Sequence, residues 1–196
     1  MDYFENIFAT TNPSLEGFDF NELQGKLSED EKDALSRPFT KKEVGAALKR
    51  MAPTKAPGLD GFCALFFQRY WDIVGNDISR SMLSVLNGRA MLRDMNQIVI
   101  SLIPKVKKLK TMKGIRPISL CNTTYNIVSK AISNRIKQVL PHIIDDKQSV
   151  FVPKRIITDN VMAAYETFHF MKKRMIRRRS WVVAKLDMSK AYDKVE

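Results

Sequence analysis

Strand-forming segments are few, short and far apart in this sequence, and long helical segments separate them. The β-branched run "QIVISLIP" (97–104) ends in proline and predicts one strand. The charged stretch 105–116 that follows predicts an exposed hairpin tip. The run "WVVAKLD" (181–187) predicts a later strand, which has no partner within the chain. This order predicts an α+β fold that is mostly helical with a few short strands.

Helical periodicity covers most of the remaining sequence. The stretch "TKKEVGAALKRM" (40–51) opens with a capping box in which Thr40 and Glu43 exchange hydrogen bonds. The helix expected at 122–139 has Asn122 as its cap and an apolar face formed by Val128, Ile132 and Val139. Further helices are expected at 21–35, at 62–73 with heavy burial, at 76–87, and at 158–173 with Asp159 in the first turn.

The charge of the chain is unevenly distributed. The total is +12, but residues 1–36 carry nine acidic and two basic residues, a net charge of −7, so residues 37–196 carry +19. A segment this basic favours a polyanionic partner, and we interpret that partner as nucleic acid rather than a membrane surface. The sequence contains no stretch typical of a signal peptide or a membrane span, which predicts an intracellular protein without a membrane partner.

Two basic clusters account for much of this charge. A run of charges is often only a solvated face, but two clusters in a chain this basic favour contacts with phosphates. They are Lys105, Lys107, Lys108, Lys110 and Lys113 with Arg116 just beyond, and Lys172, Lys173, Arg174, Arg177, Arg178 and Arg179. The two cysteines and two histidines lack the spacing of a zinc site and are interpreted as structural residues.

Asp187 stands at the end of the last predicted strand. Its carboxylate fits either a cap or a ligand of Mg²⁺, because hard cations take oxygen donors. Nucleotidyl transfer uses two such ions, so a complete site needs two or three convergent carboxylates. Asp193 lies six residues further on and is an uncertain second ligand.

Five short motifs, taken together and in this order, resemble the reverse transcriptase of a non-LTR (LINE-type) retrotransposon. They are "KAPGLDGF" (55–62), "LIPK" (102–105), "RPISL" (116–120), "QSVFVPKRIITDN" (148–160) and "LDMSKAYDKVE" (186–196). The resemblance covers the chain from about residue 37 to its end. It implies the fingers and partial palm of a right-hand polymerase: an acidic lead-in at 1–36, a fingers-like region at 37–180, and the first palm strand with its catalytic motif at 181–196.

The resemblance also implies roles for individual residues. Asp187 matches the catalytic aspartate that binds Mg²⁺, with the backbone of Met188 beside the metal and triphosphate. Tyr192 matches the aromatic gate beneath the sugar of the incoming dNTP. Arg116, and less strongly Lys105, match the cations that clamp its triphosphate. The positions expected near an RNA template and DNA primer are Lys55, Gly58, Asp60, Gly61, Lys107, Lys108, Lys110, Lys113, Gln148, Phe151, Arg155, Arg177, Arg178 and Arg179.

Some positions depart from the family pattern. Leu59 stands where proline is usual, Val150 where a small residue is usual, and Lys154 where glycine is usual. Lys154 would strain a turn that requires a positive φ. No pair of adjacent acids follows Asp187, so the "Y/F-A-D-D" box that completes the metal site in this family is not among these residues.

Three hypotheses therefore stand. The first is a reverse transcriptase fragment that is incomplete for catalysis. The second is a non-catalytic basic RNA-binding module derived from a retroelement. The third is a chain that never forms a stable protein, because the strand expected at 181–187 would expose an unpaired edge.

Overall fold

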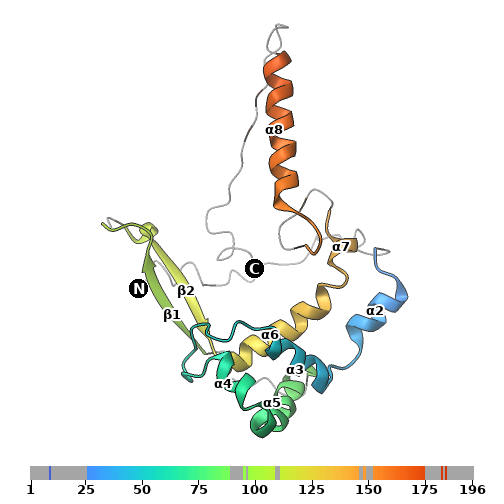
Figure 1. The fold of residues 1–196 in the computed structure, drawn as a ribbon, viewed down its shortest axis with the longest axis vertical. Helices are drawn as coiled ribbons and strands as arrows, with labels where there is room; N and C mark the ends of the chain where they lie inside the picture. Colours follow the sequence, from blue (N-terminus) through green and yellow to red (C-terminus); the bar gives the residue numbers. More distant parts are fainter. Residues whose placement is uncertain are drawn as a thin grey trace. The chain divides into compact units, whose positions relative to one another are not determined.

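The computed structural model describes residues 9, 26–88, 95, 97–108, 111–145, 148, 152–174, 182 and 184, apart from the side chains of Lys113 and Arg174. The chain divides into two compact units. One comprises residues 27–140, and the other comprises residues 141–196 together with 1–26. Figure 1 shows the first unit as helices α2–α6 with a two-stranded ribbon, and helix α8 belongs to the second.

Helices α2 (Glu29–Ser36) and α3 (Lys41–Lys49) both begin at capping boxes. In α3 the amide of Thr40 donates to Glu43 Oε2 at 2.9 Å, and the amide of Glu43 donates to Thr40 Oγ1 at 3.4 Å, as the sequence predicted. Ser28 and Glu31 make the same exchange at the start of α2. These bonds satisfy amides that lack partners within the helix, which fixes both starting points.

Helices α4 (Ala64–Arg69) and α5 (Trp71–Leu86) meet at Tyr70, so the break falls earlier than the sequence predicted. The expectation of heavy burial for α4 was wrong, because only Ala64 and Phe67 are buried whereas Phe62 and Tyr70 are 46% and 44% exposed. A helix of six residues presents one short face to the core. The core itself consists of Val44, Ala47, Leu48, Ala64, Phe67, Met82, Ile127 and Ala131.

Helix α6 spans Thr123–Ile136, and after a turn the short helix α7 spans Leu140–Ile143. The buried residues of α6 are Thr123, Ile127, Ala131 and Arg135, which recur every fourth residue. The predicted face was therefore confirmed only in part: Val139 is 4% exposed and Val128 packs against the core, but Ile132 is 40% exposed. The buried row also contains Arg135, a charged residue that the predicted apolar face did not include.

Arg135 is 5% exposed and joins α6 to the segments around α2 and α3. Its Nη2 donates to Glu43 Oε1 at 2.8 Å, and its Nε donates to the same oxygen at 3.2 Å. Its guanidinium also donates to the carbonyls of Leu35, Arg37 and Pro38. The guanidinium carbon lies 3.5 Å from the centre of the Phe39 ring. The buried charge is thus both paired and hydrogen-bonded, which burial of a charge requires.

The Glu43 carboxylate makes the stability of this unit sensitive to acid. Burial by itself raises its pKa, but the hydrogen bonds from Arg135 and Thr40 and the charge of Arg135 outweigh burial and hold the pKa below its ordinary value of 4.5. This stabilisation is complete above pH 4.5 and is lost as the pH falls through the lowered pKa. We expect urea unfolding at a series of pH values to show this loss.

Substituting Glu43→Gln should flatten that acid-dependent loss. The matched control is Glu29→Gln, because the Glu29 side chain is 85% exposed and pairs only with Lys32 among the ion pairs of the described residues. This control should retain the slope of the unaltered chain. An unchanged pH slope in Glu43→Gln would show that another group causes the acid sensitivity.

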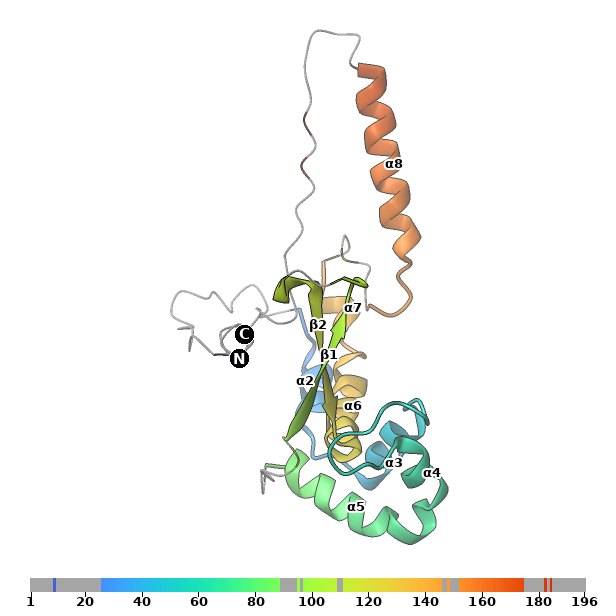
Figure 2. The same cartoon turned by 90° about the vertical axis from the view of Figure 1, so that its left-hand side faces the viewer.

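Helix α8 spans Ile157–Arg174, close to the predicted range, with Asp159 in its first turn as expected. Figure 2 shows it as a single long helix. Its apolar side chains at Val161, Tyr165 and Phe168 are 61%, 66% and 58% exposed. The part of the chain that the structure describes therefore leaves this apolar face largely uncovered.

Candidate nucleic-acid interface

Strands β1 (Ile98–Pro104) and β2 (Ile115–Cys121) pair antiparallel and form the ribbon seen in Figure 1. The sequence predicted β1 and the exposed tip that follows it. Residues paired across an antiparallel ladder share a face, and alternate residues along a strand share it too. Ile103 pairs with Arg116, and the amide of Lys105 donates to the Gly114 carbonyl at 2.8 Å. Lys105 and Arg116 therefore lie on the same face of the ribbon as diagonal neighbours.

The two strand prolines lie where a missing amide does least harm. The Lys105–Gly114 bond sets the alternation of the ladder, so the pair Ile103–Arg116 exchanges hydrogen bonds. The pairs Pro104–Ile115 and Leu102–Pro117 do not. The nitrogens of Pro104 and Pro117 consequently face away from the partner strand. Proline is tolerated at such outward positions, and it removes a donor that another strand could use.

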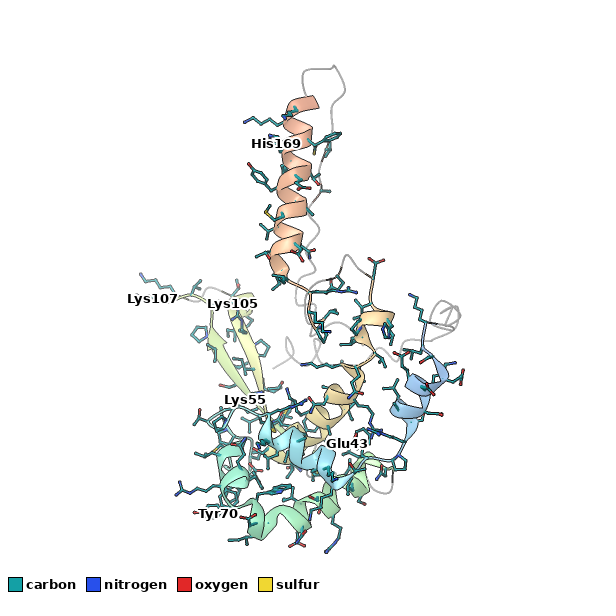
Figure 3. All side chains as sticks on the ribbon, turned by 45° about the vertical axis from the view of Figure 1, so that its right-hand side comes forward. Glu43, Lys55, Tyr70, Lys105, Lys107 and His169 are labelled. Atoms are coloured by element: carbon teal, nitrogen blue, oxygen red, sulfur yellow. The ribbon has the colours of Figure 1, made fainter. Side chains whose placement is uncertain are left out.

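The tip of the ribbon is strongly basic. Lys105, Lys107, Lys108 and Arg116 are all exposed, and Figure 3 shows Lys105 and Lys107 at the tip. Residues 97–121 contain six basic residues and no acidic residue, so nothing within the ribbon neutralises this charge. Lys110 and the side chain of Lys113 lie outside the described residues. A cationic ribbon of this kind suits phosphate groups.

The loop of residues 55–61 lies against the other end of the ribbon, where β2 passes into α6. Its turn is closed by a bond from the Gly61 amide to the Gly58 carbonyl at 3.2 Å, and Gly61 has φ +71°. Asp60 Oδ1 accepts from the amide of Phe62 at 3.1 Å. Lys55 is exposed at this end, as Figure 3 shows. Four of the predicted template-side residues, Lys55, Gly58, Asp60 and Gly61, thus share one ordered loop.

Asn122 occupies the N-cap position of α6, but it does not cap the helix as the sequence predicted. Its side chain makes no cap hydrogen bond, and its Oδ1 accepts from the amide of Asp60 at 3.3 Å. The hydroxyl of Thr123 donates to the Phe62 carbonyl at 2.7 Å. Sequence reasoning missed this use of both residues, because their partners lie more than 60 positions earlier in the chain.

Arg155 organises the segment that precedes α8. Its guanidinium donates to the carbonyls of Pro141, Ile144, Asp145 and Gln148. These four bonds join residues 141, 144, 145 and 148 to the segment just before α8. A nucleic-acid contact for Gln148 and Arg155 remains a prediction, and Phe151 lies outside the described residues.

Lys154 has φ +67°, so the turn does require the conformation that glycine adopts most easily. A left-handed conformation costs an ordinary residue roughly 1–2 kcal/mol. We expect Lys154→Gly to slow hydrogen exchange across 152–160 by about this free energy. Lys154→Ala removes the same charge but keeps the Cβ atom, so it should give no gain. Equal exchange rates in the two variants would contradict the role of backbone strain.

Several predicted site residues lie outside the described part of the chain, namely Asp187, Met188, Tyr192, Arg177, Arg178 and Arg179. Within the described residues no group of three or more His, Cys, Asp or Glu side chains could hold a metal ion. The structure therefore describes the ribbon and the loop, whereas the metal site is predicted from the sequence motif alone. Among the described residues, no helix has the length and apolar character needed to cross a membrane.

Comparison with known proteins identifies the sequence pattern. Residues 103–196 match the family model described as reverse transcriptase (RNA-dependent DNA polymerase). The chain is also 39% identical, over 99% of its length, to the transposon TX1 uncharacterized 149 kDa protein of Xenopus laevis. It spans about 15% of the length of that relative.

Proposed function

We propose that this chain is part of the reverse transcriptase of a non-LTR retrotransposon and forms the fingers and the first palm motif of a right-hand polymerase. The observed mixture of helices with a two-stranded sheet is consistent with such an α+β fragment. The function proposed for these residues is to bind an RNA template, a DNA primer and a dNTP during RNA-directed DNA synthesis.

The observation that carries this proposal is the shared ribbon face of Lys105 and Arg116. Both side chains are exposed, they are diagonal neighbours, and no acidic residue lies within 97–121. The planar fork of arginine binds two phosphate oxygens at once, and lysine adds a point charge. We propose that this face binds the triphosphate of the incoming nucleotide. The tip lysines and the 55–61 loop contact the template strand.

The catalytic part of the proposal rests on the motif at 186–196. Asp187, with the backbone of Met188, would hold Mg²⁺, and Tyr192 would lie beneath the sugar of the dNTP. The metal would supply charge stabilisation at the reacting phosphate. Asp187 with Asp193 offers too few carboxylates for two ions in line, so the 196 residues by themselves are proposed not to polymerise.

A primer-extension assay tests the catalytic proposal. The chain is mixed with an RNA template, a DNA primer, Mg²⁺ and all four dNTPs, and we expect no extended product above background. Extension that disappears in Asp187→Ala would overturn the claim that these residues are insufficient for catalysis. Extension that survives Asp187→Ala would point to a contaminating polymerase.

The basic ribbon also favours a second candidate function, a non-catalytic RNA-binding module. Each phosphate contact to a single strand contributes about 0.7 to the slope of log affinity against log salt concentration. Replacing both Lys107 and Lys108 by alanine should therefore reduce that slope by about 1.4 for single-stranded RNA. Asp187→Ala should leave it unchanged.

Nucleotide binding separates the two functions. If the chain serves only as an RNA-binding module, neither the unaltered chain nor Arg116→Ala should bind a dNTP. If the polymerase proposal holds, dNTP binding to the chain with template and primer should weaken in Arg116→Ala and in Lys105→Ala. Equilibrium binding of a labelled dNTP measures both.

A further inference from the structure

Gly58 and Asn122 approach each other more closely than any other residue type at position 58 would permit. A Cβ atom on Gly58 would lie 2.3 Å from Asn122 Oδ1, 2.4 Å from the Asn122 amide nitrogen and 2.6 Å from the Cys121 carbonyl carbon. Two of these neighbours are backbone atoms, which cannot move aside as a flexible side chain can. The backbone of the loop is therefore packed directly on the junction between β2 and α6.

Hydrogen bonds on both sides of this contact hold the loop in place. Asn122 Oδ1 accepts from the amide of Asp60 at 3.3 Å, and Thr123 Oγ1 donates to the Phe62 carbonyl at 2.7 Å. Thr123 is 3% exposed and Asn122 is half-buried, so water competes weakly for these bonds. We call the Gly58 contact and these two hydrogen bonds the loop lock.

We propose that Asn122 is a positioning residue that fixes the 55–61 loop relative to the nucleotide-binding face of the ribbon. Arg116 lies five residues before Cys121 on the same strand, which corresponds to roughly 17 Å along β2. The loop lock thus holds the loop at one end of the strand whose other end carries Arg116. This role rests on the proposed function, in which the loop contacts the template and Arg116 contacts the dNTP.

The side chain of Asn122 is suited to this role by its oxygen. An asparagine at a helix start ordinarily caps its own helix, and here its oxygen serves a distant loop instead. Asn122→Ala removes the acceptor, whereas Asn122→Asp keeps an oxygen at the same place. Asn126→Ala is a matched control, because Asn126 Nδ2 donates to the Cys121 carbonyl at 3.1 Å and so serves the strand end rather than the loop.

The two cysteines of the sequence both lie at the loop lock and report on it directly. Cys63 follows Phe62, Cys121 precedes Asn122, and both residues are half-buried. In a Cys121→Ser background, the rate at which a thiol reagent labels Cys63 measures how often the 55–61 loop moves away from the β2–α6 junction. We expect Asn122→Ala to raise this rate about fivefold, as loss of one hydrogen bond implies. Asn122→Asp should restore the rate, and Asn126→Ala should not change it.

The affinity for a single-stranded RNA oligonucleotide, measured by fluorescence anisotropy on the same variants, tests the functional part. Asn122→Ala should weaken binding several-fold more than Asn126→Ala while both variants remain folded by circular dichroism. An unchanged Cys63 rate in Asn122→Ala would overturn the loop lock. A faster rate with RNA affinity equal to that of Asn126→Ala would overturn the positioning role. If the unaltered chain binds no RNA, the proposed function and the positioning role both fail, while the labelling rates still report the lock.

Discussion

Replacing Arg135 by alanine is expected to lower the free energy of unfolding by about 3–5 kcal/mol, the usual cost of removing one partner from a buried ion pair. The substitution leaves the Glu43 carboxylate, itself 25% exposed, without its strongest donor. It also removes the donors to the Leu35, Arg37 and Pro38 carbonyls and the contact with Phe39. Because a domain is stable by only about 5–15 kcal/mol, urea unfolding should detect this loss easily.

A double-mutant cycle separates the ion pair from the remaining contacts of Arg135. Glu43→Gln should cost less than Arg135→Ala, because the carbonyl contacts of the guanidinium survive. Arg135→Lys keeps the charge but loses the fork, so it should fall between the two. If the free-energy losses of Arg135→Ala and Glu43→Gln simply add in the double variant, the two side chains are not coupled and the explanation is wrong.

The elements that could be predicted from the sequence are those determined by neighbouring residues. Thr40 and Glu43 lie three positions apart, so the capping box at the start of α3 was readable directly. The run at 97–104 combined β-branched residues with a final proline, which was sufficient to predict β1. The burial of Arg135 on α6 was not readable in this way. Arg135 is buried because Glu43, 92 positions away, pairs with it, and no local pattern records that partner.

The same limit applies to the candidate site. The motifs predicted that the 55–61 loop and the basic residues of the ribbon belong to the site, and the pairing register places Lys105 and Arg116 on one face. The motif containing Gly58 did not reveal why that position is glycine. A Cβ atom added to its positive-φ neighbour Gly61 would meet no atom within 4 Å, so there the backbone angle alone favours glycine. At Gly58 the reason is a close approach to Asn122, which only the folded chain creates.

Gly58→Ala is therefore expected to destabilise the unit by about 1–3 kcal/mol, the typical cost of inserting a methyl group where no space exists. The added carbon would meet the backbone of Cys121 and Asn122 below 3 Å, so the loop must move away. That movement breaks the bonds to Asp60 and Phe62. Urea unfolding measures the loss, and faster thiol labelling of Cys63 should accompany it.

Gly45→Ala is expected to have the opposite effect on the stability of the same unit. Gly45 lies inside α3, and a Cβ atom there would meet the Trp71 ring at 3.6 Å, an ordinary contact. Alanine restricts the unfolded chain and favours the helix, so this variant should be more stable by about 0.5–1 kcal/mol. If the two glycine substitutions change the free energy of unfolding in opposite directions, the effect at Gly58 is caused by its surroundings. If Gly58→Ala instead behaved like Gly45→Ala, the loop would not be packed on the β2–α6 junction, and Asn122 could not position it.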